Sequence, residues 1–288
     1  MMHSRELERL ATTFGWVPRA QSMTSTPEAT NQHDLDHSVA SAYSDEAWRH
    51  IEELATTSWW YRTRNQILAD ELEGCINPPT IWDVGGGSGV VAQHLMTKGF
   101  EVVLIEPTRA GAMIALERGV PSLCSTLENL QLPSECLPAL GLFDVLEHIE
   151  NRARTLSELS RVLVPGGHLV LTLPAITSLW SGSDLSAGHF IRYNKRTIRR
   201  ELELHGFEIQ RLGYFFALTV LPLFVLRALP YRLGFRKPVA EDQTLAASGG
   251  VFGRIAAAIE RRIAMRTPIG TSLLVVARKS AGSAARND

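Results

Sequence analysis

Four glycines within five residues follow a short apolar run that ends near an acid. The run covers residues 80–84 and contains Asp83, and Gly85, Gly87 and Gly89 alternate through the loop behind it. Because glycine has no Cβ, such a loop can adopt positive φ angles and let a ligand lie directly against the main chain. The first amides of a following helix point into the same space. The loop therefore predicts a ligand site, with an ordinary turn as the alternative.

A second acid follows the loop after about twenty residues, the spacing at which a carboxylate can take both hydroxyls of a ribose. Residues 101–105 form an apolar run, and Glu106 comes directly after it. The pairing of the glycine loop with Glu106 favours a ligand that contains a ribose over an ordinary turn.

Two histidines stand where a substrate could lose a proton. His148 follows a predicted strand at residues 140–143, and His189 lies in the connection after a predicted strand at residues 168–173. Histidine suits the work of a general base because its pKa lies near neutrality. The alternative for His148 is a hydrogen bond to a neighbouring loop, so both catalytic assignments are hypotheses.

Three polar side chains accompany His189 in the same connection, namely Asp184, Arg192 and Tyr193. Loops above a doubly wound sheet are where substrates dock, so these side chains are candidates to orient the substrate or the base. The alternative is a self-contained polar network that stiffens the loop.

Strands and helices alternate through the middle of the chain. Helices are predicted at residues 90–98, 110–118, 151–163 and 197–205, between strands near residues 81–84, 102–105, 122–125, 140–143, 168–173, 207–209 and 271–277. Such alternation implies a parallel sheet that is covered on both faces. The predicted fold class is α/β, a Rossmann-like doubly wound, mostly parallel seven-stranded sheet.

Composition narrows the range of partners. The chain has 288 residues and a net charge of −1, so no global field argues for nucleic acid as a partner. Its three cysteines are scattered without metal-ligand spacing, which indicates a reduced, cytoplasmic setting with no disulfide framework, no zinc site and no other metal. Nothing in the sequence indicates an oligomeric state.

The whole pattern resembles the class I S-adenosylmethionine-dependent methyltransferases, from residue 59 onward. The motifs that carry the resemblance are the glycine loop, Glu106, the residues 144–148 that end the fourth strand, and the Pro-Gly-Gly turn at residues 165–167. The resemblance implies S-adenosyl-L-methionine as cofactor. It also implies a small-molecule, sugar or lipid-linked acceptor that is methylated at oxygen.

The resemblance assigns the cofactor-binding residues one by one. The loop residues Asp83, Gly85, Gly87 and Gly89 would receive the methionine end of the cofactor, and Glu106 would hold its ribose. Asp144 would stand beside the reactive methyl group. The end of the third strand has no acid for the adenine amino group, so adenine would rest on Leu127.

A narrower resemblance is to the type 11/12-like bacterial branch of this family. Its marks are the aromatic and basic stretch at residues 59–64, which contains Trp60, and the motif at residues 179–193 that contains His189. Trp60 is either a substrate-facing lid residue or part of the packing that attaches a helical cap. Ile191 replaces an arginine that this branch usually has, which removes one expected anion contact.

An apolar stretch interrupts the pattern before the last strand. Residues 214–226 are uncharged, four cations follow by residue 237, and there is no acid from Arg211 through Ala240. An apolar segment followed by cations suits a membrane interface. Residues 213–237 therefore predict peripheral contact with the inner face of the membrane, with a lid over the substrate or a dimer contact as the alternatives.

These observations divide the chain into five segments. They are a flexible arm at 1–40, a helical cap at 41–78, a cofactor-binding core at 79–212, an apolar and basic helical insertion at 213–266, and a final strand with a polar tail at 267–288. Two other functions remain open at this stage. One is a nicotinamide-dependent oxidoreductase, which shares the glycine loop and ribose acid, and the other is a non-catalytic accessory protein that binds the cofactor or the membrane.

Overall fold

The computed structural model of the chain describes residues 58–235 and 250–281, apart from the side chain of Phe252. The predicted arm at 1–40, most of the cap before α4, the last part of the basic segment and the polar tail lie outside the described residues.

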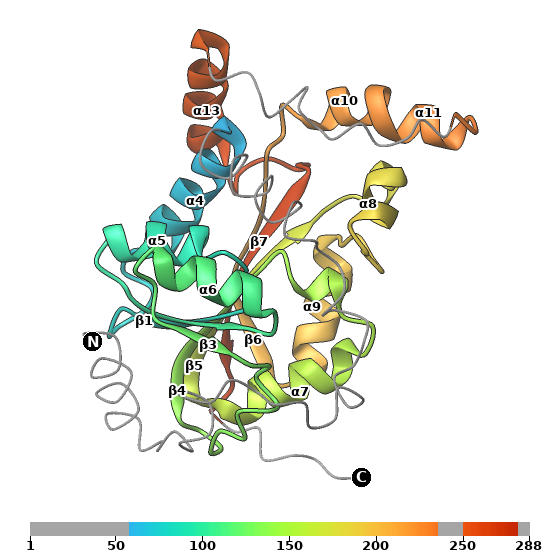
Figure 1. Ribbon diagram of the computed structural model, residues 1–288. Coiled ribbons are helices and arrows are strands. Elements are labelled where there is room, and N and C mark those ends of the chain that lie inside the picture. Colours follow the sequence, from blue (N-terminus) through green and yellow to red (C-terminus); the bar gives the residue numbers. More distant parts are fainter. Residues whose placement is uncertain (1–57, 236–249, 282–288) are drawn as a thin grey trace.

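A seven-stranded sheet forms the centre of the described chain, in the order β3-β2-β1-β4-β5-β7-β6 (Figure 1). β7 runs antiparallel to β5 and β6, and the other neighbouring strands are parallel. The prediction of a Rossmann-like, mostly parallel sheet is thus confirmed. The strands are β1 (Thr80–Val84), β2 (Glu101–Glu106), β3 (Ser122–Cys124), β4 (Leu137–Phe143), β5 (Leu163–Pro174), β6 (Phe207–Phe215) and β7 (Ser272–Lys279).

Helices cover both faces of the sheet, and each face has its own apolar cluster. One cluster takes in buried side chains of α4 (Trp59–Leu72), α5 (Val90–Thr97) and α6 (Arg109–Glu117), with Ala264 after α13 (Val251–Ile263). The other takes in α7 (Arg152–Val162) and α9 (Lys195–Leu204). Helical periodicity explains the second cluster, since Ile198 and Leu202 are one turn apart on α9 and both are fully buried.

The structure sets three boundaries that the sequence left approximate. Trp59 and Trp60 form the first turn of α4, where the Ser58 hydroxyl accepts a hydrogen bond from Trp60 N at 3.1 Å. β5 begins at Leu163, so the Pro-Gly-Gly turn lies inside the strand. β6 continues to Phe215, so the predicted insertion starts a few residues later than residue 213.

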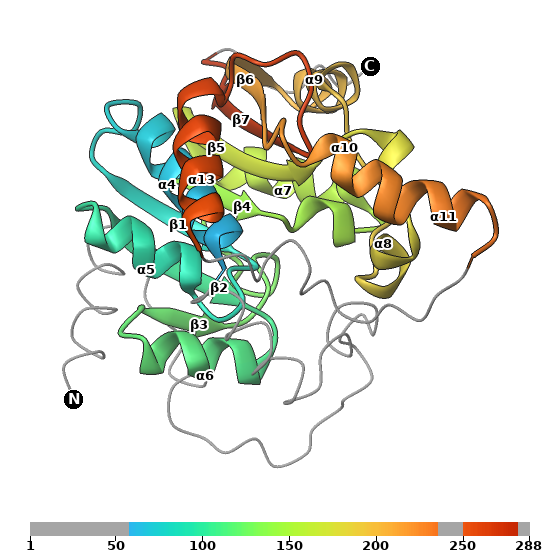
Figure 2. The same cartoon turned by 90° about the horizontal axis from the view of Figure 1, so that it is seen from above.

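Directly after β6, within its connection to β7, three helical pieces follow one another and extend away from the sheet (Figures 1 and 2). They are α10 (Val220–Leu223), the π-helical η4 (Phe224–Ala228) and α11 (Leu229–Arg232), and we call residues 220–232 the apolar arm. Glu260 of α13 fixes its base, because the buried carboxylate accepts hydrogen bonds from Ala217 N at 3.1 Å and Leu218 N at 2.7 Å.

Candidate active site

The glycine loop between β1 and α5 has the backbone that its sequence predicts. Gly85, Gly87 and Gly89 have φ angles of 74°, 57° and 77°, a region that L side chains rarely adopt. A Cβ at Gly89 would lie 2.9 Å from the Cβ of Ala115 on α6. The loop is therefore packed tightly against α6, and the glycines at alternate positions leave its main chain without side chains there.

Glu106, at the end of β2, ties this loop to the adjacent strand. Its carboxylate accepts hydrogen bonds from Gly87 N at 3.0 Å, from Thr108 N at 2.9 Å and from the Thr108 hydroxyl at 2.6 Å. Burial raises the pKa of Glu106, and the hydrogen bonds from Thr108 and Gly87 oppose that rise. Glu106 thus stands beside the loop where the resemblance expects a ribose, and the ribose contact itself stays a prediction.

Asp83 lies beneath the loop and is fully buried. Neither of its carboxylate oxygens has a hydrogen-bond partner among the described residues. Burial raises the pKa of Asp83 to about 7, with Arg64 opposing the rise and Glu106 adding to it. A Cβ at Gly86 would come within 2.6 Å of Asp83 Oδ2, so the loop glycine leaves this carboxylate its space. A cationic group reaching the loop would supply the partner that Asp83 lacks.

Asp144 follows β4 with a φ angle of 58°, and its amide donates to Thr172 O at 3.0 Å. Its carboxylate forms an ion pair with the buried Arg64 of α4. The Arg64 guanidinium lies 5.3 Å from the Trp60 ring and 5.2 Å from the Tyr61 ring. The structure therefore connects two predicted site residues, Asp144 and Trp60, through an arginine that the prediction did not single out.

Trp60 itself stacks on Phe216, with ring centroids 5.1 Å apart. Phe216 comes directly after β6, so this contact joins the start of α4 to the base of the apolar arm. The packing alternative for Trp60 is thereby observed, and its contact with a substrate stays a prediction.

Asp184 is the centre of a polar network in the connection after β5. This carboxylate, in the short helix α8 (Gly182–Ser186), is 3.0 Å from His189 Nδ1 and accepts from Arg192 Nε at 2.7 Å. Burial alone would raise its pKa, but the hydrogen bonds from His189 and Arg192 hold the pKa of Asp184 below its ordinary value. The network joins three of the predicted residues.

The two predicted catalytic histidines are in contact, although they are far apart in the sequence. Their ring centroids are 4.7 Å apart in an edge-to-face arrangement. His148 belongs to the short helix η2 (Leu146–His148), and His189 follows α8. Burial, and then the neighbouring His189, lower the pKa of His148 to about 4. His148 is therefore uncharged near neutral pH.

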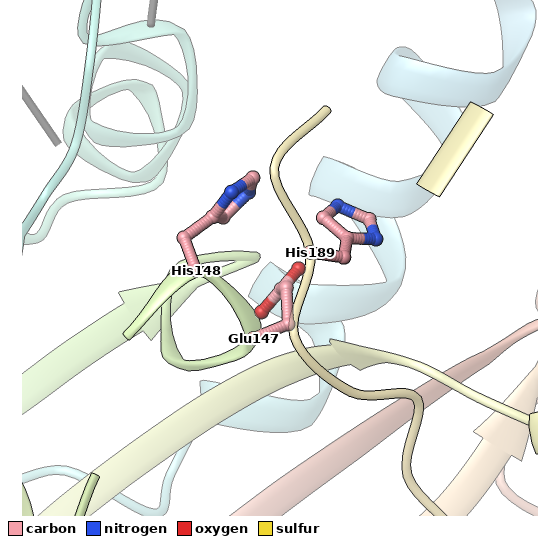
Figure 3. Close-up of side chains that lie close together, drawn as sticks. All are labelled: Glu147, His148 and His189. Atoms are coloured by element: carbon pink, nitrogen blue, oxygen red, sulfur yellow. The ribbon is translucent and has the colours of Figure 1, made fainter. Parts of the chain in front are cut away.

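Glu147 joins this pair and was missed by sequence reasoning (Figure 3). Its side chain is 1% exposed, and its Oε2 has no hydrogen-bond partner among the described residues. Burial, and then the nearby Asp144, raise the pKa of Glu147 well above its ordinary value. The available signal was a glutamate beside a candidate histidine at a strand end, but adjacency in sequence does not show which way a side chain points.

Two predicted residues lie inside the protein. Tyr193 is fully buried, and its hydroxyl donates to Glu201 Oε2 at 3.2 Å. Leu127 is 1% exposed and belongs to the apolar cluster that contains the ends of β1 and β2. Tyr193 thus anchors the connection after β5 to the apolar core. Direct contact of either side chain with a ligand stays a prediction.

Comparison with known proteins places this site in a family context. Residues 60–212 match a family model described as a methyltransferase domain. A probable S-adenosylmethionine-dependent methyltransferase from Mycolicibacterium smegmatis is 27% identical over 187 residues, which are 63% of this chain and 72% of that protein. The mitochondrial ubiquinone biosynthesis O-methyltransferase of Rattus norvegicus is 32% identical over 109 residues, 34% of this chain and 32% of that protein.

A solved structure supports the same fold. It is a SAM-dependent methyltransferase from Thermotoga maritima, described as a possible histamine N-methyltransferase. It superposes with a TM-score of 0.55 at 17% identity, covering 82% of this chain and 97% of its own. None of these matches supports the nicotinamide-dependent oxidoreductase that the sequence left open.

Proposed function

The chain belongs to the methyltransferase domain family and is an S-adenosylmethionine-dependent methyltransferase, and we propose that it methylates a hydroxyl oxygen of a small or lipid-linked acceptor. The observation that carries the proposal is the contact of 3.0 Å between Asp184 Oδ1 and His189 Nδ1, next to His148. A carboxylate that orients a histidine is the arrangement of a general base.

The residues around the glycine loop fit the proposed donor. S-adenosylmethionine supplies an electrophilic methyl group on a positively charged sulfur, and its methionine end carries an ammonium group. Asp83 offers a buried carboxylate without a partner among the described residues, and Gly86 brings no side chain against it. We assign Asp83 to the ammonium group, Glu106 to the ribose, and Asp144 with its partner Arg64 to the methionine end.

On the acceptor side, His189 would remove the proton. A proton on Nδ1 satisfies Asp184, and the lone pair of Nε2 is then available for the proton of the acceptor hydroxyl. As this proton moves to Nε2, the acceptor oxygen forms its bond to the methyl carbon and the carbon–sulfur bond breaks. Arg192, which is held by Asp184 and by Ala175 O at 3.0 Å, would keep the carboxylate in place. Little covalent machinery is required, because alignment supplies most of the rate.

The acceptor atom can be tested directly. Incubation of the protein with a donor that carries a ¹³C-labelled methyl group and with fractionated cell extract should give a labelled product. Its methyl carbon should have the NMR shift of a methyl ether. A labelled product whose methyl group is on nitrogen or carbon would contradict O-methylation while leaving the methyltransferase assignment intact.

The apolar arm supports an acceptor that is linked to lipid. Leu221, Leu226 and Leu233, at and just beyond the arm, are 69%, 62% and 65% exposed. The Arg232 guanidinium lies 5.9 Å from the Phe224 ring, so cations accompany the apolar face. No described helix is long and apolar enough to cross a membrane. We infer that the arm rests in the interface of the inner leaflet.

Flotation with anionic vesicles tests this attachment. The unchanged protein should float with the vesicles, and a Leu221→Glu, Leu226→Glu double variant should stay in the soluble fraction. Leu204→Glu is the matched control, because Leu204 is 73% exposed on α9, outside the arm. Equal flotation of the double variant and the control would count against the arm as the contact.

A further inference from the structure

We propose that Glu147, His148 and His189 form a binding site for one divalent transition-metal ion, which would hold the oxygen of the acceptor. The inference rests on the proposed O-methylation and adds a metal ion to the site where the acceptor would bind. The proposal starts from geometry: one ligand atom from each of the three side chains lies within 4.8 Å of the others. Figure 3 shows these side chains, two from η2 and one from the loop after α8.

The distances between the three ligand atoms would suit a metal ion after small movements of the side chains. Zinc binds nitrogen and oxygen ligands at about 2.0–2.2 Å, which places neighbouring ligand atoms roughly 3.3 Å apart in a tetrahedral site. Side-chain movements of about 1 Å would close the present spacing. The loop does not crowd the His148 ring at Gly188, since even an added Cβ there would lie 4.0 Å from His148 Nδ1.

The surroundings of His189 point independently to a ligand. A histidine that binds a metal usually donates its other ring N–H to a carboxylate or main-chain carbonyl, which fixes the ring and its tautomer. Asp184 Oδ1 lies 3.0 Å from His189 Nδ1, and Ser181 N and Arg192 Nε hold that carboxylate at 2.9 and 2.7 Å. His189 is thereby positioned to present Nε2.

His148 and Glu147 show corresponding features. The His148 ring lies against the His189 ring, with the two centroids 4.7 Å apart in an edge-to-face arrangement. Glu147 is 1% exposed with an Oε2 that lacks a partner among the described residues. A buried, unsatisfied carboxylate oxygen is costly, and a cation would satisfy it.

The donor set selects the class of metal. Two imidazoles and one carboxylate favour zinc, iron, cobalt or nickel over magnesium, which prefers oxygen ligands. Three protein ligands also leave at least one coordination position for another molecule, as in catalytic rather than structural sites.

The metal would change how the acceptor loses its proton. A hydroxyl bound to the cation has a lowered pKa, so it would ionise and release its proton to solvent. The resulting alkoxide would form the carbon–oxygen bond as the carbon–sulfur bond breaks. Nε2 of His189 would then bind the cation instead of the acceptor proton, while Asp184 keeps its positioning role.

A cobalt titration tests the site without any acceptor. Tag-free full-length protein, first treated with a chelator, is titrated with Co²⁺ while the visible absorption is recorded. We expect saturation at one equivalent, with displacement by Zn²⁺. Glu147→Gln, His148→Gln and His189→Gln should each abolish the saturable bands, and His205→Gln should not, because His205 lies at the end of α9 with its Nδ1 against Glu201 O.

Asp184→Asn adds a graded test, since loss of a carboxylate behind a ligating histidine weakens metal affinity about 10- to 100-fold. Affinity for S-adenosylmethionine, measured on each variant, shows that the fold is intact. Absence of saturable cobalt bands in the unchanged protein, or bands in the three ligand variants as strong as those of the unchanged protein, would overturn the metal site. Methyl transfer that survives chelation but is lost in His189→Gln would also overturn it, and would leave O-methylation by a histidine base standing.

Discussion

The region that we assign to the donor and the region that we assign to the acceptor are built in opposite ways. The donor region is one short stretch, the glycine loop from Asp83 to Gly89, with Glu106 tied to it by hydrogen bonds. The acceptor region gathers η2, the connection after β5 and the base of the apolar arm. Its contacts join residues that are distant in the sequence. For example, Phe190 N donates a hydrogen bond to Glu147 O at 2.8 Å.

This difference separates two kinds of constraint. In the donor region, the main chain of the loop must come close to the ligand, so the region tolerates little change in side-chain volume. The acceptor region is defined by titratable side chains, so it responds to the loss of single polar groups. Variants in the two regions should therefore fail in different measurements.

The largest expected effect comes from the acceptor region. His189→Gln keeps a polar side chain beside Asp184 but removes the nitrogen that either takes the acceptor proton or binds the proposed cation, so turnover should fall about 10²- to 10⁴-fold, the range usual for loss of a general base. Steady-state kinetics on the acceptor from the labelling experiment would measure this, with His205→Gln as the matched control. Turnover that remains within a factor of three would contradict the role of His189 in the reaction.

The second effect is a pH dependence in the donor region. Burial raises the pKa of Asp83 to about 7, whereas an unfolded chain would have a value of about 4. The folded state thus holds this proton more tightly, so the contribution to stability is fully present below about pH 4 and is lost as the pH rises through 7. Three pKa units correspond to an upper limit of roughly 4 kcal/mol.

Thermal unfolding of the ligand-free protein between pH 5 and pH 8 measures this effect. The unchanged protein should lose more stability over that range than Asp83→Asn, which does not titrate. The affinity for S-adenosylmethionine should rise over the same range, because the carboxylate form pairs with the ammonium group. Parallel unfolding curves for the two proteins would show that Asp83 does not titrate there.

The third effect is a loss of donor affinity when a side chain is added to the tightly packed glycine loop. In Gly86→Ala the new methyl group would lie 2.6 Å from Asp83 Oδ2 and 2.6 Å from Leu104 Cδ1. Such overpacking costs typically 1–3 kcal/mol, which predicts about a 10- to 100-fold loss of donor affinity. Gly250→Ala is the control, because nothing lies within 4 Å of its added Cβ. Calorimetry that finds equal donor affinity in both variants would argue against a tight loop.

The smallest effect concerns Tyr193. Tyr193→Phe removes the hydroxyl that donates to Glu201, so it should lower the free energy of unfolding by about 1 kcal/mol. Because this side chain is fully buried, the KM for the acceptor should not change. Denaturant unfolding and acceptor kinetics together decide the matter, and a KM raised at constant stability would instead support a substrate contact.

The sequence predicted the fold and the backbone conformation of the glycine loop well because their signals are local. Alternating strands and helices, glycines that need positive φ, and an acid at the end of β2 all appear within short windows of the chain. Residues such as Gly87 and Glu106 act through the backbone next to them, so sequence position almost determines their place.

The acceptor region was less predictable because tertiary contacts assemble it. The inward direction of Glu147 depends on η2, and the contact between His148 and His189 depends on how the loop after α8 packs against η2. Tyr193 was assigned to the substrate from its neighbours in the motif, yet the turn between β5 and α9 directs its side chain into the core. Sequence spacing carries no information about these directions.

The most direct test of the account compares donor binding and turnover in one pair of variants. Calorimetry with S-adenosylmethionine should show that His189→Gln binds the donor as tightly as the unchanged protein while its turnover collapses. Gly86→Ala should lose donor affinity. If His189→Gln lost donor affinity as strongly as Gly86→Ala, or kept full turnover, the division into a donor loop and a histidine-centred acceptor region would be wrong.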